Sequence, residues 1–355
     1  MRVGIPREIK VLEGRVALVP EAVAELVHDG HQVYVETGAG RLSGYDDELY
    51  RQAGADVLDS AAAVYEQAEL IVKVKEPIEA DLVLLRKDHL LFSFLHLAAN
   101  PELTRRLQQL GLTAVAFETV EEADRRLPLL APMSNIAGRL AGQIGTTLLH
   151  QPHGGKGLLL GGLPAAERGH VVILGAGVAG LAAAEVLAAM GAEVVVFDLN
   201  RDRLATLRSL GNNVTALYPY RHQIEREVRR ADLLIGAVLL IGQKTPHLVS
   251  ADDVRAMAKG SVVIDISVDQ GGCIETTRPT TYAKPTFVWE DIVHFAVTNM
   301  PGAVPRSASQ ALSAALTPYL RILATPAWRQ NEALQRGINV QNGEIIHPAL
   351  QQSVT

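Results

Sequence analysis

The sequence predicts an α/β protein with parallel sheets, and two observations carry that prediction. Short apolar runs alternate with segments of helical pattern along all 355 residues, as in chains built from βαβ units. One run leads into a glycine-rich turn and then an alanine-rich helix, within residues 170–200. The length allows two domains, each with a core of its own.

Composition narrows the function classes. Hydrophobic residues make up 48% of the chain, which argues against wide disorder, and the net charge of -6 argues against a nucleic-acid partner. Cys273 is the single cysteine, so we expect no disulfide framework and a reducing compartment. The N-terminus has no apolar signal region, and no apolar run reaches the ~18 residues of a membrane span. We therefore expect a cytoplasmic protein without a membrane partner, and we expect no metal site.

The first part of the chain predicts several strands and two helices. Strands are expected at 2–5, 32–36, 69–75, 90–95 and 113–118, and helices at 19–31 and 100–111. In the third strand, alternation puts Lys73 and Lys75 on one face. Because burying an unpaired ammonium is costly, we expect these lysines to have a carboxylate partner, an exposed face or a task.

The middle of the chain predicts a second domain inserted into the first. A glycine-rich loop or hairpin at 148–162 precedes the block 170–200, and strands are expected at 231–239 and 261–267. Long helices at 134–149 and 307–324 bracket the block, and Gly138 and Gly142 would let the former pack closely. The predicted domains are 1–130 plus 307–355, for substrate and catalysis, and 131–306, for the nucleotide.

The strongest local motif is GAGVAG at 175–180, between a strand and a helix. Its glycines permit a tight turn, close approach of a pyrophosphate and close helix–sheet packing. Asp198 ends the next strand, where a carboxylate can bind the ribose 2′-OH, which favours NAD over NADP. A plain glycine turn with a capping Asp is the alternative, and Arg201 and Arg203 leave the preference open. We expect two Rossmann-like domains with parallel sheets, linked by long helices, with the active-site cleft between them.

Two further loops fall at predicted strand ends. VDQGGC, at 268–273, places Asp269 and two glycines at the edge where open parallel sheets bind ligands. A glycine turn with a solvated Asp is the alternative. NMPGAVPR, at 299–306, is a similar edge loop and could equally be a domain hinge.

Polar residues also mark probable strand ends in the first domain. Arg15 suits a bidentate grip on a carboxylate, although a surface ion pair is an equal alternative. His96 suits general base work, although a lone histidine after an apolar run is more often structural. With Lys75, these residues suggest a substrate cleft beside the nucleotide domain.

At this point the chain resembles a known family over nearly its full length. The matching stretches, in order, are VGIPREIK, RVALVPEAVAELV, VETGAG, VKVKEP, LHLAANPELT, LPLLAPMSNIAGR, LLGGLP, VVILGAGVAG, DQGGCIETTRPTT and VTNMPGAVPR. They resemble the alanine dehydrogenase and pyridine nucleotide transhydrogenase family.

The resemblance implies reversible, NAD-dependent oxidation of L-alanine to pyruvate and ammonia, in a homo-oligomer that is commonly a hexamer. It implies that Arg15, Lys75 and Asn299 bind substrate and that His96 and Asp269 are catalytic. The cofactor contacts that it implies are Ser134, Gly175, Gly177, Val178, Ala179, Gly180, Asp198, Arg203, Val238, Leu239, Ile266, Ser267, Val268, Arg278, Val297, Thr298 and Met300.

Some residues depart from the family pattern. GAGVAGL and SNIAG are more similar to the NAD(H)-binding subunit of transhydrogenase, which does no amino-acid chemistry and is the alternative function. Phe117 replaces a frequent Tyr, Tyr220 a small Ser and Ile241 a common Pro. A dehydrogenase for a larger amino acid, or a scaffold without activity, is a third possibility.

Overall fold

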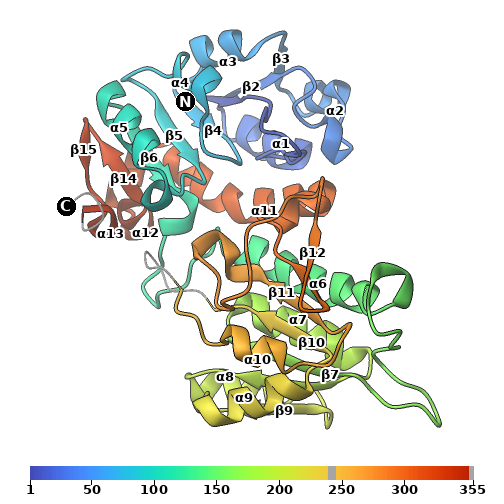
Figure 1. Ribbon diagram of the computed structural model, residues 1–355. Helices are drawn as coiled ribbons and strands as arrows, with labels where there is room; N and C mark the ends of the chain where they lie inside the picture. Colours follow the sequence, from blue (N-terminus) through green and yellow to red (C-terminus); the bar gives the residue numbers. More distant parts are fainter. Residues whose placement is uncertain (239–244, 352–355) are drawn as a thin grey trace. The chain divides into compact units, whose positions relative to one another are not determined.

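The computed structural model describes residues 1–238 and 245–351, and they form two compact units. Unit 1 comprises Met1–Met133 and Gly302–Thr355, and unit 2 comprises Ser134–Pro301. The chain thus leaves unit 1, builds all of unit 2 and returns. In each unit the strands gather into one sheet with helices beside it (Figure 1).

Unit 1 is built on an eight-stranded sheet of order β15-β14-β6-β5-β4-β1-β2-β3 within the described residues. Its strands are β1 (Arg2–Ile5), β2 (Gln32–Glu36), β3 (Asp56–Leu58), β4 (Leu70–Val72), β5 (Leu90–Ser93), β6 (Thr113–Ala116), β14 (Ile338–Gln341) and β15 (Glu344–Ile345). The first six run parallel, whereas β14 and β15 pair antiparallel. Its helices are α1 (Pro20–His28), α2 (Asp47–Gln52), α3 (Ala61–Gln67), α4 (Glu79–Leu82), α5 (Pro101–Leu110), α11 (Pro305–Leu323), α12 (Glu332–Arg336) and α13 (Pro348–Gln351).

Unit 2 has a seven-stranded sheet of order β12-β13-β11-β10-β7-β8-β9 in the described part of the chain. Its strands are β7 (His170–Leu174), β8 (Glu193–Phe197), β9 (Val214–Leu217), β10 (Leu233–Gly236), β11 (Val262–Asp265), β12 (Thr286–Trp289) and β13 (Ile292–Phe295). Only β12 among them is antiparallel. Its helices are α7 (Val178–Ala189), α8 (Arg201–Arg208), α9 (Arg221–Arg230), α10 (Ala251–Arg255) and most of α6 (Ala131–Leu148).

Both sheets share one topology, which positions the sites. In chain order, their parallel strands follow the arrangement 3-2-1-4-5-6 of doubly wound folds. The strand order therefore reverses between β1 and β4 in unit 1, and between β7 and β10 in unit 2. Ligands of such sheets bind beyond the carboxyl ends of the strands at this switch point. The predicted fold class, α/β with two Rossmann-like parallel sheets and long helices, is confirmed.

The central strands form because their side chains are apolar on both faces. All residues of β4, β7, β10 and β11 are buried, as expected for parallel strands covered by helices on each side. Apolar clusters lie around them, among them one in unit 1 that includes Ile71 and Leu91 and one in unit 2 that includes Val172 and Leu234.

The helix α6 packs closely on α7, as its glycines predict. A side chain at Gly138 would overlap the Ala179 carbonyl oxygen, and one at Gly142 would lie 3.2 Å from Val186. Among the described residues, no helix is long and apolar enough to cross a membrane.

The predicted strand 69–75 is too long, because β4 ends at Val72. The Glu8 carboxylate accepts hydrogen bonds from the backbone N–H of Val74 (2.6 Å) and Lys75 (3.3 Å), so a side chain takes the place of a neighbouring strand on that edge. On the other edge the Phe94 N–H still donates to the Val74 carbonyl oxygen. Lys73 and Lys75 do not share an environment: Lys73 is buried and Lys75 is half-buried. Other strand and helix ends differ from prediction by only a few residues.

Candidate functional site

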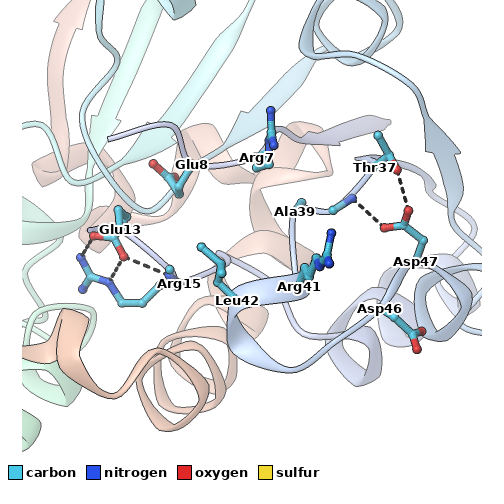
Figure 2. Close-up of a pocket in the computed structure, with 12 residues that line it drawn as sticks. Arg7, Glu8, Glu13, Arg15, Thr37, Ala39, Arg41, Leu42, Asp46 and Asp47 are labelled. Atoms are coloured by element: carbon cyan, nitrogen blue, oxygen red, sulfur yellow. Dashed lines mark hydrogen bonds and ion pairs between the residues drawn. The ribbon is translucent and has the colours of Figure 1, made fainter. Parts of the chain in front are cut away.

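The substrate residues predicted in unit 1 lie at the carboxyl edge of its sheet. A cavity of about 720 Å³ lies there, bounded by the segments that follow β1 and β2. Figure 2 shows the residues that line it. Its lining residues are Arg7, Glu8, Glu13, Gly14, Arg15, Thr37, Gly38, Ala39, Arg41, Leu42, Asp46 and Asp47. The cavity thus lies beyond the carboxyl ends of β1 and β2 and carries both cationic and anionic side chains. Arg15 is among its lining residues, whereas Lys75 and His96 are not.

Arg15 is held firmly in this cavity wall. Its Nε and Nη2 donate to the Glu13 carboxylate at 2.6 and 2.5 Å, and its Nη1 lies 3.2 Å from the Met133 sulfur. The flanking backbone is fixed by α11, since Val16 donates to the Ser309 hydroxyl and Val19 to that of Ser313. Arg15 therefore does form an ion pair, but a buried one and not the surface pair considered above.

Lys75 follows β4, and Glu8 holds its backbone next to the switch point. The Glu8 carboxylate also lies 3.6 Å from the Lys73 ammonium, and both side chains are nearly fully buried. Lys73 donates to Asp81 at 3.1 Å, so the carboxylate partner expected for this lysine is present twice over.

His96 lies beyond the neighbouring strand β5, in a left-handed backbone conformation (φ 49°). The backbone N–H of His96 donates to the Glu118 carboxylate at 2.6 Å, and the ring Nδ1 lies 4.0 Å from the same carboxylate oxygen. The ring stacks on Phe94, with centroids 5.8 Å apart and planes 3° apart, and its side chain is 47% exposed. A strained, supported and accessible histidine is unlike one that merely fills a core.

Phe117, at the position where the family often has Tyr, packs in an aromatic cluster. It is fully buried and meets Phe92 and Phe94 edge-on, with ring centroids 4.5 and 5.0 Å away. The ring of Phe117 thus packs against Phe94, on which the His96 ring stacks.

In unit 2, the glycine turn has the geometry that a dinucleotide requires. Gly175 (φ 97°) follows β7, and a side chain there would lie 2.5 Å from the Ala237 carbonyl oxygen. A side chain at Gly180 would overlap the Gly175 carbonyl oxygen, whereas one at Gly177 would meet no described atom within 4 Å. The open approach at Gly177, at the start of α7, suits a pyrophosphate.

Asp198 is tied to this turn. Its carboxylate accepts from the Ala176 N–H at 2.6 Å and from the Asn200 N–H at 2.7 Å, and Arg203 lies 3.7 Å away. The acidic group therefore stands beside the phosphate loop, where the ribose of a dinucleotide lies in this fold. Val178 and Ala179, at the first turn of α7, are exposed and half-buried respectively.

The remaining predicted residues of unit 2 follow β10, β11 and β13. Ile266, Ser267 and Asp269 lie on a 3₁₀ turn after β11, and Asp269 is exposed. The Ser267 hydroxyl donates to the Val238 carbonyl at 2.7 Å, which joins two of the predicted cofactor positions. Ser134 lies near the start of α6, and Val268 is buried in the 3₁₀ turn. The Arg278 guanidinium lies 4.5 Å from the centroid of the Phe287 ring. The other predicted residues follow β13: Val297, Thr298, Asn299 and Met300.

Some predictions fall elsewhere. Leu239 and Ile241 lie outside the described residues. Tyr220 is 62% exposed and packs against Tyr218, with ring centroids 4.9 Å apart. In residues 1–238 and 245–351, no group of three or more His, Cys, Asp or Glu could hold a metal ion.

Sequence reasoning missed four acidic residues that organise these sites: Glu8, Glu13, Glu118 and Asp265. Each carboxylate accepts from a backbone N–H near a predicted site residue. A charge inside an apolar run, as in VVIDIS, was the available signal for Asp265.

Two doubly wound sheets, one with a glycine turn and an adjacent carboxylate, define a dinucleotide-binding protein. The family model "Alanine dehydrogenase/PNT, N-terminal domain" matches residues 4–137, and "Alanine dehydrogenase/PNT, C-terminal domain" matches residues 141–348. The chain belongs to this family, which confirms the resemblance seen in its sequence. Membership implies a pyridine nucleotide cofactor.

Individual relatives agree. The chain is 47% identical to "Alanine dehydrogenase" of Bacillus subtilis, over 99% of this chain and 94% of that protein. A solved "L-alanine dehydrogenase" superposes with a TM-score of 0.95 at 49% identity, covering 100% of this chain and 99% of the other. The transhydrogenase from Sinorhizobium meliloti superposes with a TM-score of 0.85 at 26% identity, covering 98% of this chain and 100% of the other.

Proposed function

We propose that the protein catalyses the reversible, NAD-dependent oxidative deamination of L-alanine to pyruvate and ammonia. The observation that carries this proposal is the match, along 99% of the chain, to a relative named for that activity. The supporting geometry is a buried arginine and a lysine beyond the carboxyl ends of the strands of one sheet, with a glycine turn suited to a dinucleotide in the other.

Arg15 and Lys75 would bind the carboxylate of alanine. A guanidinium carries five N–H donors in a planar fork, and Glu13 engages its Nε and Nη2, which fixes the plane of the fork. Glu8 would hold the Lys75 backbone so that the ammonium supplies a second positive charge. Asn299, in the loop after β13, would contact the same substrate.

His96 would move the protons. When alanine is oxidised at Cα, its amino group becomes an imine, and water must then add to the imine carbon. His96 would take a proton from that water and return it to the departing ammonia. Asp269 would orient the water or the amine and stabilise the positive charge that develops on nitrogen.

The residues of unit 2 fit NAD. The open approach at Gly177 and the start of α7 would hold the pyrophosphate, and Asp198 would bind the ribose hydroxyls. The bound nicotinamide supplies a hydride acceptor for Cα. The other contacts proposed are the positions after β10, β11 and β13 described above, together with Ser134 and Arg278.

An assay tests the proposal directly. Purified protein is given L-alanine and NAD⁺, and NADH formation is followed, with glycine, serine and 2-aminobutyrate in parallel. We expect turnover on alanine above the other three amino acids. No turnover on alanine or its close analogues would remove the proposal. A homo-oligomer, a hexamer by family resemblance, and a cytoplasmic location are further expectations, which sedimentation and fractionation can test.

The second candidate is a transhydrogenase-like subunit that binds NAD(H) without amino-acid chemistry. The structural match to a transhydrogenase at 26% identity favours it, as do GAGVAGL and SNIAG. Tight NADH binding without amino-acid turnover would support it, as would a neighbouring gene for a membrane subunit.

A further inference from the structure

Asp265 is a fully buried carboxylate that closes the loop on which Asp269 lies. It is the last residue of β11, and the 3₁₀ turn Ile266–Gln270 follows it directly. One carboxylate oxygen accepts from the Ser267 N–H at 2.9 Å, at the start of the loop. The other accepts from the N–H groups of Cys273 (2.9 Å) and Ile274 (3.2 Å), at its end.

A hydroxyl completes this arrangement. The Thr277 hydroxyl lies 2.9 Å from the Asp265 oxygen that binds Cys273 and Ile274, and 2.8 Å from the Ile274 carbonyl oxygen, so its one hydrogen is shared between these two acceptors. The four donors thus come from both ends of residues 266–277 and converge on one side chain. An ionised carboxylate has acceptor capacity for all of them, because it carries two oxygens and no hydrogen.

The surroundings leave the carboxylate little room to move. A side chain at Gly272 (φ 75°) would lie 2.8 Å from the Asp265 carboxylate, and one at Gly236 would lie 3.0 Å from it. The buried Cys273 side chain packs against the same group. Gly272 in the loop and Gly236 at the end of β10 therefore allow the backbone to approach Asp265 closely.

We propose that Asp265 is a positioning residue: it fixes the loop that presents Asp269 and the backbone of Ile266 and Ser267. The inference rests on the proposed function, in which Asp269 is catalytic and Ile266 and Ser267 contact the cofactor. Without the clamp, the ends of the loop lose a common anchor and Asp269 loses its fixed direction. Misplacement by about 1 Å can cost about 10²-fold in rate.

Asp265→Asn tests the clamp at nearly constant volume. An amide replaces one acceptor oxygen with an NH₂ group, which then faces backbone N–H donors. Glu227→Gln is the matched control, since Glu227 is also buried in unit 2 but pairs with His170, Arg226 and Arg230. Both variants remove a buried carboxylate, and only the first concerns the loop.

The first readout is amide hydrogen exchange of the intact protein by mass spectrometry. We expect faster exchange in peptides spanning 266–274 for Asp265→Asn and unchanged exchange there for Glu227→Gln. The second readout is steady-state kinetics. We expect kcat to fall about 10²-fold for Asp265→Asn, with the KM for alanine little changed, and wild-type kcat for Glu227→Gln.

NADH affinity, measured by fluorescence, separates this inference from the substrate assignment. We expect Asp265→Asn to weaken NADH binding about tenfold, comparable to one lost hydrogen bond. If the wild type binds NADH but does not oxidise alanine, the substrate proposal fails, while exchange and NADH affinity still decide the clamp. Unchanged exchange at 266–274, or faster exchange with wild-type kcat and NADH affinity, would overturn it.

Two milder variants, both at Thr277, test the proposal if the Asp265→Asn protein does not fold. Thr277→Val keeps the shape of the side chain and removes one donor, whereas Thr277→Ser keeps the hydroxyl. We expect Thr277→Val to reduce kcat and speed exchange in the loop, and Thr277→Ser to restore both. Equal behaviour of the two variants in both measurements would overturn the proposal.

Discussion

The Lys73 ammonium lies 3.1 Å from the Asp81 carboxylate, and neither side chain is more than 4% exposed. Burial lowers the pKa of Lys73, but Glu8 and Asp81 outweigh it, so its pKa is raised and the charge is kept. Asp81 also accepts from the Tyr65 hydroxyl at 3.0 Å and from the Ile78 N–H at 3.0 Å. Lys73 is therefore the cation of a buried network that joins the switch point of unit 1 to α4.

Removing this cation should destabilise the protein strongly. Lys73→Met leaves Glu8 and Asp81 buried without their cation, and breaking a buried pair in this way costs about 3–5 kcal/mol. The free energy of unfolding from urea titration measures the effect. Arg106→Met is the control, because its pair with Glu79 is exposed and such pairs contribute about 0–1 kcal/mol. A similar loss in both variants would contradict the prediction.

His96→Ala should reduce kcat by about 10²–10⁴-fold, the usual contribution of a general acid or base. The fold and NADH binding should survive, since the ring is half exposed and stacks on Phe94 alone among the described aromatic side chains. Glu118→Ala should reduce kcat less, because it removes the acceptor that fixes the His96 backbone and leaves the imidazole. An unchanged kcat in His96→Ala would exclude its role in proton transfer.

Asp198→Gly should lower the preference for NAD over NADP. The carboxylate repels a 2′-phosphate, and Arg203, 3.7 Å from it, would remain to attract one. The ratio of kcat/KM for the two nucleotides measures the change. Asp202→Asn, on the exposed first turn of α8, is the control and should keep the wild-type ratio. If Asp198→Gly also keeps that ratio, the ribose contact is wrong.

The buried ring of His294 should make stability depend on pH. Burial lowers the pKa of His294, whose Nε2 lies 2.8 Å from the Thr276 hydroxyl and whose ring stacks on Phe287. The unfolded chain then binds this proton more readily than the folded one. The resulting stability is present above the unfolded pKa of about 6.5 and is lost as the pH falls below it.

The measurement is urea unfolding of the wild type and His294→Gln at about pH 7.5 and 5.5. Other histidines titrate in both proteins. The effect of His294 is therefore the difference between wild type and variant in how much the free energy of unfolding changes from about pH 7.5 to about pH 5.5. We expect the variant to lose less stability on acidification. An equal change of the free energy of unfolding in both proteins would show that His294 has the same pKa in the folded and the unfolded chain.

The sequence predicted the fold class because the signals are local. Alternating apolar runs and the turn at 175–180 depend on neighbouring residues, and each lies where it was expected. The end of β4 could not be predicted, because Glu8, 66 residues before Val74, takes the hydrogen bonds there. Glu118 and Asp265 were missed for a related reason, since their partners are backbone N–H groups that only the fold brings near.

The return of the chain to unit 1 has a consequence for synthesis on the ribosome. The edge of β6 is covered by β14, which belongs to the last part of the chain. While Ser134–Pro301 is translated, which takes roughly 10–30 s at about 5–20 residues per second, the nascent N-terminal sheet has β6 as an open edge. Unpaired strand edges can pair with other chains, so the nascent chain is exposed to aggregation during this time, whereas in the complete protein β14 covers that edge.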